Sequence, residues 1–201
     1  AAIALHNALL YQDEQHRSYE LTTLATLPQA ISSIRDSKDL FSQLVEGITP
    51  LLDVEIVGFL IYNEITQKLE AQQPFVGVPP NFVDLYRIAL PPGSPAERVW
   101  DKHEKIFATS AIEDHRLIDL GFDHPSRAAG IKNTVLIPLT SGGRSLGYLQ
   151  VANKKGSAPF DEDDDRILSI LAGQAASIIE NADLIEQSIQ RALRAESLRR
   201  I

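Results

Sequence analysis

Histidine, serine and acidic side chains carry most of the chemical potential of this sequence, because cysteine is absent. Without cysteine there is no thiolate nucleophile, no thiolate metal ligand and no attachment point for a covalent bilin. His103, His115 and His124 could each ligate a haem iron, but all three stand in polar stretches typical of exposed surface. Asp114 and His115 could form a catalytic dyad, yet no nucleophile lies near them in sequence. We therefore expect that the chain is not an enzyme.

Two further motifs have both a chemical and a structural interpretation. Ser141-Gly142-Gly143 lies between two strand-like segments, whereas a nucleophile elbow or a phosphate-binding loop joins a strand to a helix. The acidic run 161–165 could bind a cation, but it also opens a long helical segment, where acidic side chains favour the positive end of the helix dipole. The sequence therefore predicts a hairpin turn, a helix start and no metal site.

Composition limits the class of protein. The 201 residues are 44% hydrophobic with a formal net charge of −8, which suits one hydrophobic core and disfavours nucleic acid as a partner. No apolar run reaches transmembrane length and no signal peptide opens the chain. We expect a cytoplasmic segment without membrane contact of its own. The first residue is not Met, so we expect a piece of a longer protein. A membrane anchor elsewhere in that longer protein is compatible with this expectation.

Runs of apolar and β-branched residues predict an antiparallel sheet. The expected strands are 54–62, 68–76, 106–109, 134–139 and 145–152. Tight polar turns join the first pair and the last pair, and such turns connect antiparallel neighbours. The predicted class is α+β, with a central antiparallel sheet of five to six strands, helices packed on one face, and long helices at both ends.

The last helical segment, 161–201, contains no Pro and a single Gly, so that one helix of about 60 Å is expected. Its apolar residues recur at alternating steps of four and three, which is the spacing of a coiled-coil seam. We expect the part up to residue 179 to cover the sheet and the later part to need a partner helix. The predicted partner is a second copy in a parallel homodimer, with contacts at Ile178, Ala182, Ile185 and Ile189.

An internal similarity suggests a tandem arrangement. Segments 1–10 and 175–184 are identical at five of ten positions. We therefore interpret 1–34 as the exit helix of a preceding domain of the same kind. The expected layout is this linker helix, a domain over 35–184, and a coiled-coil linker helix over 185–201.

Four segments together show a family pattern: 129–139, 143–154, 159–164 and 175–182. Through them the stretch 37–184 resembles the GAF family of small-molecule sensor domains. The resemblance implies a sensor that signals through dimeric helices to an output domain such as a histidine kinase or a cyclic-dinucleotide enzyme. One branch of the family reduces free methionine sulfoxide with cysteines, which this chain lacks.

Some cyclic-nucleotide-binding GAF domains share a signature that this chain matches in part, at Asn153, Lys154, Phe160 and Asp164, with Asp165 in place of Glu. In the family a Lys–acid pair joins the last strand to the exit helix. The partial match has two interpretations: a structural ion pair between Lys154 and Asp164, or a signature of cyclic-nucleotide binding. The first is favoured over the second.

The resemblance also implies a ligand, a cyclic nucleotide or another metabolite, between the sheet and the loops of residues 80–130. The residues predicted to line that site are Phe59, Ile61, Tyr86, Trp100, Ile112, His115, Val135, Ile137, Tyr148 and Gln150. Tyr86, His115 and Gln150 are the expected polar contacts, whereas plain core is the better interpretation of the four strand residues, Phe59, Ile61, Val135 and Ile137. The alternative function is a ligand-free GAF domain that serves as a dimerisation spacer.

Overall fold

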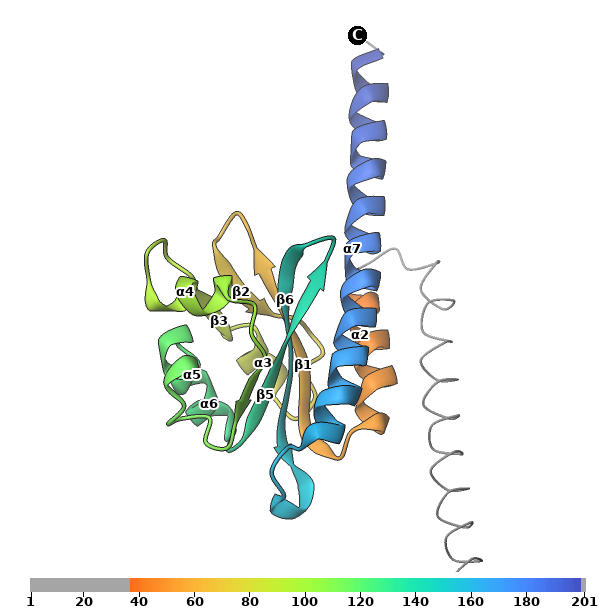
Figure 1. Ribbon diagram of the computed structural model, residues 1–201. Coiled ribbons are helices and arrows are strands. Elements are labelled where there is room, and N and C mark those ends of the chain that lie inside the picture. The colour runs from red at the N-terminus through yellow and green to blue at the C-terminus, as the bar shows by residue number, and fades with distance from the viewer. Residues whose placement is uncertain (1–36, 200–201) are drawn as a thin grey trace, which may run out of the picture. The chain divides into compact units, whose positions relative to one another are not determined.

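A six-stranded antiparallel sheet forms the centre of the computed structural model, which describes residues 37–199 (Figure 1). The strands follow the spatial order β3-β2-β1-β6-β5-β4. Their bounds are β1 Val54–Asn63, β2 Lys68–Ala71, β3 Arg87–Ala89, β4 Ile106–Ala108, β5 Thr134–Ser141 and β6 Arg144–Lys154. The α+β class and the antiparallel sheet are therefore confirmed. The predicted helix over 1–34 and its repeat relation lie outside the described residues.

Two strand predictions needed correction. The second strand ends at Ala71 rather than at residue 76, because the chain leaves the ladder at Gln73 and Pro74, and proline has no N–H to donate. Strand β3 was missed, because three residues between two proline-rich stretches carry little strand signal. It pairs with β2 through Ile88, opposite Leu69.

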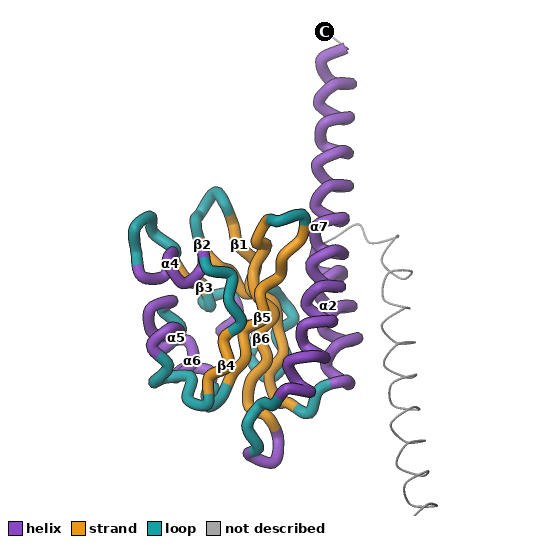
Figure 2. The backbone as a smooth tube through the Cα atoms, viewed as in Figure 1, coloured by secondary structure: helices purple, strands orange, loops and turns teal. Residues whose placement is uncertain are grey.

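Helices cover both faces of the sheet, not one as predicted (Figure 2). Helix α2 (Ser37–Ile48) and helix α7 (Glu162–Arg199) form a helix layer on one face. The other face is covered by a loop layer with four short helices, α3 Pro80–Val83, α4 Pro95–Asp101, α5 His115–Leu120 and α6 Asp123–Ala129. A short 3-10 turn, Thr49–Leu51, follows α2. A second one, Lys155–Ser157, follows β6.

Strand alternation assigns each side chain to one of these layers. On β1 and its neighbour β6, Phe59 lies opposite Leu149 and faces the helix layer, where its ring is 5.7 Å from that of Phe41 on α2. Leu60 and Tyr148 are likewise paired, but they belong to the core beneath the loop layer. Both faces of the central strands are thus buried and apolar.

Helix α7 begins as predicted and leaves the sheet without a break. Asp161 is its N-cap: the carboxylate accepts the N–H groups of Asp163 and Asp164, each at 3.0 Å. The helix covers β5 with buried residues up to Ile179. Ile178 is itself 8% exposed and packs within the domain, so its prediction as a partner contact is corrected. Ala182 is half-buried, whereas Ile185 and Ile189 are exposed.

None of the helices between residues 37 and 199 combines the length and apolar character that crossing a bilayer requires.

Candidate functional site

A chain of buried polar groups runs across the loop-facing side of the neighbouring strands β5 and β6. The Tyr86 hydroxyl donates to Gln150 Oε1 at 2.8 Å. Gln150 Nε2 donates to the Thr134 hydroxyl at 3.3 Å, and Thr134 donates in turn to the Val151 carbonyl at 2.9 Å. All three side chains are buried, so that each hydrogen bond offsets the loss of contact with water.

Two buried tyrosines stay neutral in this environment. Burial raises the pKa of the Tyr86 hydroxyl far above its ordinary value, and the hydrogen bond to Gln150 opposes this only in part. Burial also raises the pKa of Tyr148, and the negative charge of Glu104 adds to the effect. Both hydroxyls therefore stay protonated at physiological pH, and that of Tyr86 donates to Gln150.

Two hydroxyls under the loop layer are buried without a hydrogen-bond partner among residues 37–199. They belong to Tyr148 on β6 and Ser126 on α6, both 0% exposed. Buried hydroxyls in native proteins are seldom left unpaired, because each unpaired group costs about 1–3 kcal/mol. These two atoms are therefore the points under the loop layer at which an incoming polar group would gain most.

Aromatic side chains fill much of the same space. The Trp100 ring lies 5.1 Å from that of Tyr62 and 5.5 Å from that of Tyr148. Phe75 covers Gly58, a position of β1 without a side chain: a Cβ added there would meet the Phe75 ring at 2.3 Å. Phe75 and Phe122 both contact Tyr86, at 5.7 and 5.9 Å between ring centroids. The loop-side interior is thus well packed by the chain's own rings.

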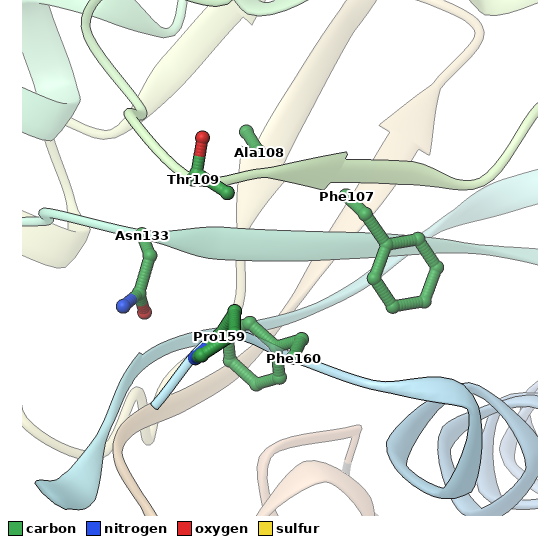
Figure 3. A pocket seen from close by; sticks show the side chains of 6 residues that line it. All are labelled: Phe107, Ala108, Thr109, Asn133, Pro159 and Phe160. Atoms are coloured by element: carbon green, nitrogen blue, oxygen red, sulfur yellow. The ribbon is translucent and has the colours of Figure 1, made fainter. Parts of the chain in front are cut away.

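A separate cleft with a volume of about 180 Å³ lies at the β4 edge of the sheet, beside the segment that leads into α7. Figure 3 shows Asn133 and Phe107 extending from the sheet toward that segment. Its lining residues are Phe107, Ala108, Thr109, Asn133, Pro159 and Phe160. None of the ten residues predicted to bind a ligand contributes to this cleft.

A family model described as "GAF domain" matches residues 34–180, more than half of the chain. The chain belongs to the GAF family. A search of curated proteins finds no match.

Solved GAF-type structures share the fold at low sequence identity. The GAF domain of an Acinetobacter phosphoenolpyruvate-protein phosphotransferase is 20% identical with a TM-score of 0.63, over 84% of this chain and 98% of that one. Residues 122 to 287 of a methyl-accepting chemotaxis protein are 18% identical with a TM-score of 0.64, over 79% and 98%. Free methionine-R-sulfoxide reductase from Neisseria meningitidis, in complex with its substrate, is 19% identical with a TM-score of 0.61, over 83% and 91%.

The GAF fold brings together only some of the predicted ligand residues. Tyr86, Trp100, Tyr148 and Gln150 gather under the loop layer, and all four are buried. The other four strand residues were placed on the wrong face, because alternation turns them toward the helix layer: Phe59, Ile61, Val135 and Ile137.

His115 and Ile112 lie at the rim rather than inside. His115 is exposed at the first position of α5, and Ile112 is half-buried in the turn before it. The neighbouring Asp114 does not pair with His115. Its carboxylate binds Arg116 at 2.6 Å, and that hydrogen bond holds the pKa of Asp114 below its ordinary value. No Asp–His dyad is therefore formed here.

The sequence analysis missed Thr134, Ser126, Phe122 and Phe75. Thr134 and Gln150 share one face by strand alternation, so the period-2 pattern could have found Thr134 once Gln150 was chosen. Nothing local in sequence marks Ser126, which reaches the interior because α6 packs beneath the sheet.

The partial signature has a structural role in this GAF domain. Lys154 Nζ forms the predicted ion pair with Asp164 and also lies 3.2 Å from Asp161. The hydrogen bond to Asp164 raises the pKa of Lys154. Asn153 Oδ1 accepts the Lys132 N–H at 2.8 Å, and its amide donates to Glu55 at 3.0 Å. Lys154 thus joins the end of β6 to the start of α7, and Asn153 joins it to Lys132 and to Glu55 on β1.

Within residues 37–199, no three or more His, Asp or Glu side chains are arranged to hold a metal ion. The acidic run at the start of α7 is engaged in capping and in ion pairs with Lys154 and Lys105.

Replacing Tyr148 by Phe should stabilise the ligand-free domain. The substitution removes a buried hydroxyl that has no partner and keeps the ring against Trp100. We expect the thermal midpoint to rise by about 2–4 °C, measured by differential scanning fluorimetry. The matched change Gln150→Leu should lower it, because it leaves the buried Tyr86 hydroxyl unpaired. A loss of stability in Tyr148→Phe would show that this hydroxyl is satisfied.

Proposed function

We propose that this GAF domain is a sensory module that binds a small molecule beneath its loop layer and passes the bound state to its flanking helices. One observation carries the proposal: β6 presents buried polar groups to the loop layer on one face and packs under the helix layer on the other. A ligand that engages Gln150 or Tyr148 would therefore act on a strand in contact with both layers.

The ligand class follows from the lining. Aromatic rings and neutral polar groups dominate the loop-side interior, which suits a flat metabolite with hydrogen-bonding edges. A cyclic nucleotide is one such ligand in the proposal, and no catalytic role is part of it.

The route out of the domain is α7. Beyond Ala182 its apolar stripe continues as Ile185 and Ile189, which are 60% and 50% exposed. An exposed stripe of this kind gains by burial against another helix. We propose that a second copy covers it in a parallel homodimer in the cytoplasm, without nucleic acid as a partner. An output domain such as a histidine kinase or a cyclic-dinucleotide enzyme would then receive the signal.

The dimer has a direct test. The double variant Ile185→Asp/Ile189→Asp should weaken self-association at least about 100-fold, since burying unpaired charge in a helix seam costs several kcal/mol. Light scattering after size exclusion measures this over a concentration series. Ile170→Asp is the control, because Ile170 is also 45% exposed but lies where α7 covers the sheet. A wild-type chain that stays monomeric at high concentration would contradict the dimer.

One observation favours a second function, a ligand-free spacer that holds two helices in register. The rings of Phe75 and Trp100 occupy space that a ligand would need, so binding requires them to move.

A thermal-shift screen with cyclic nucleotides and common metabolites separates the two functions. A ligand at 100 times its dissociation constant should add about 2.7 kcal/mol, or about 5–11 °C. Gln150→Leu should abolish that shift, whereas Phe107→Ala, in the separate cleft at the β4 edge, should retain it. A screen without any shift, together with native protein that purifies without bound ligand, would support the spacer.

A further inference from the structure

Strand β6 is tied to helix α7 at both of its ends. At its first residue, Arg144 Nη2 lies 3.5 Å from the Asp183 carboxylate. Beside it, the Ser141 hydroxyl donates to Glu180, and Gly142 leaves room for that carboxylate, which would be 3.3 Å from an added Cβ. At its last residue, Lys154 pairs with Asp164 and Asp161 on the first turn of the helix.

The two ties differ in strength. The Lys154 and Asp164 side chains are 16% and 22% exposed, and Lys154 also donates to the Pro159 carbonyl. Arg144 and Asp183 are 49% and 48% exposed, and exposed ion pairs are weak because water and salt screen them. The start of α7 is thus anchored more firmly than its exit, where one exposed ion pair stands beside the Ser141–Glu180 hydrogen bond.

The weak tie marks the point where α7 leaves the domain. Figure 1 shows the β5–β6 hairpin ending beside α7. The buried side of the helix ends at Ile179, one residue before Glu180, and Leu184 and Ile185 just beyond Asp183 are exposed. The hairpin tip is therefore the last described contact between the sheet and the helix.

The same strand carries the loop-side groups. Gln150 and Tyr148 lie on β6 between its two ties, and Gly147 and a register shift opposite Leu139 separate them from the tip. An irregularity of this kind bends the strand and increases its local twist, so that the hairpin tip is aimed differently from the rest of β6.

We propose that the hairpin tip 141–144 is a releasable contact that sets where α7 leaves the domain, with Arg144 and Ser141 as its positioning residues. That a bound ligand releases this contact rests on the proposed ligand-sensing function. The contact itself does not depend on ligand and can be tested without one.

Hydrogen–deuterium exchange of the full chain tests the contact. In Ser141→Ala/Arg144→Gln, amide exchange over 180–187 should rise about three- to ten-fold, the size expected from losing two weak interactions, while 166–176 stays within two-fold of wild type. The matched control is Lys105→Gln, which removes an ion pair of similar exposure, 42% and 38%, to Asp165 in the first turn of α7. In this control, amide exchange should rise in the first turn of α7 and stay unchanged over 180–187.

A charge exchange completes the design. Arg144→Asp should raise exchange over 180–187, and Arg144→Asp/Asp183→Arg should return it to within two-fold of wild type. Unchanged exchange in the first variants, a uniform rise over the whole helix, or no recovery in the charge exchange would each overturn the proposal. A ligand screen without hits leaves these outcomes untouched, so the failure of sensing and the failure of the contact are distinguishable.

Discussion

Gly147→Ala is expected to lower the free energy of unfolding by about 3 kcal/mol or more and the thermal midpoint by about 6–12 °C. Gly147 lies in the middle of the sheet with φ near +155°, opposite Ile61 on β1. A Cβ there would stand 1.9 Å from the Leu60 carbonyl oxygen and 3.0 Å from the Ile61 Cα. These are backbone atoms of the neighbouring central strand, so they cannot move aside without breaking the ladder. Calorimetry measures the loss.

Gly173→Ala is the matched control for that substitution. Gly173 is exposed on α7, and an added Cβ would meet no atom within 4 Å. Alanine in a helix interior is about 0.5–1 kcal/mol more favourable than glycine, so this variant should be slightly more stable than wild type. A midpoint for Gly147→Ala within 2 °C of wild type would mean that β1 and β6 do not approach each other as described.

Phe122→Ala is expected to cost about 3–5 kcal/mol, or about 6–20 °C in thermal midpoint. Phe122 is 0% exposed, joins α5 to α6, and packs edge-on against Tyr86 at 5.9 Å between ring centroids. Its removal leaves a cavity beneath the loop layer and withdraws support from the Tyr86–Gln150 hydrogen bond. Calorimetry gives the stability loss, and loss of ligand-induced stabilisation should accompany it.

Phe82→Ala on α3 makes the same chemical change at a residue that is 36% exposed. It should cost clearly less than Phe122→Ala, because about a third of this side chain is already in water in the folded state. Equal losses in the two variants would contradict the placement of Phe122 at the centre of the loop-side core.

Local patterns in the sequence were sufficient for the long central strands, the last hairpin and the start of α7, but not for β3 or for the end of β2. The apolar runs predicted β1, β5 and β6, and the Ser141-Gly142-Gly143 turn predicted the hairpin between the last two. Asp161 caps α7 as expected, and Lys154 pairs with Asp164 as the partial signature indicated. These features depend on residues within about ten positions of one another, and short-range sequence carries that information directly.

Short-range sequence patterns did not show which residues come together in the candidate site. Tyr86 and Gln150 are 64 positions apart, and only the path of the chain around β3 and α4 brings them within 2.8 Å. The assignment of Phe59, Ile61, Val135 and Ile137 to the ligand side was wrong for a related reason. Alternation shows which residues share a face but does not show which face lies under the loops.

By itself, then, the sequence determined the class of fold, the family and the course of α7 from its acidic start. Only the tertiary structure decided which side of the central strands meets the loop layer and which meets α2 and α7. The physical reason is that both faces of β1, β5 and β6 are largely buried and mostly apolar, so no contrast between a wet and a dry face distinguishes them in sequence. The choice is made by packing: Phe41 of α2 against Phe59 on one side, and Phe75 against the bare backbone of Gly58 on the other.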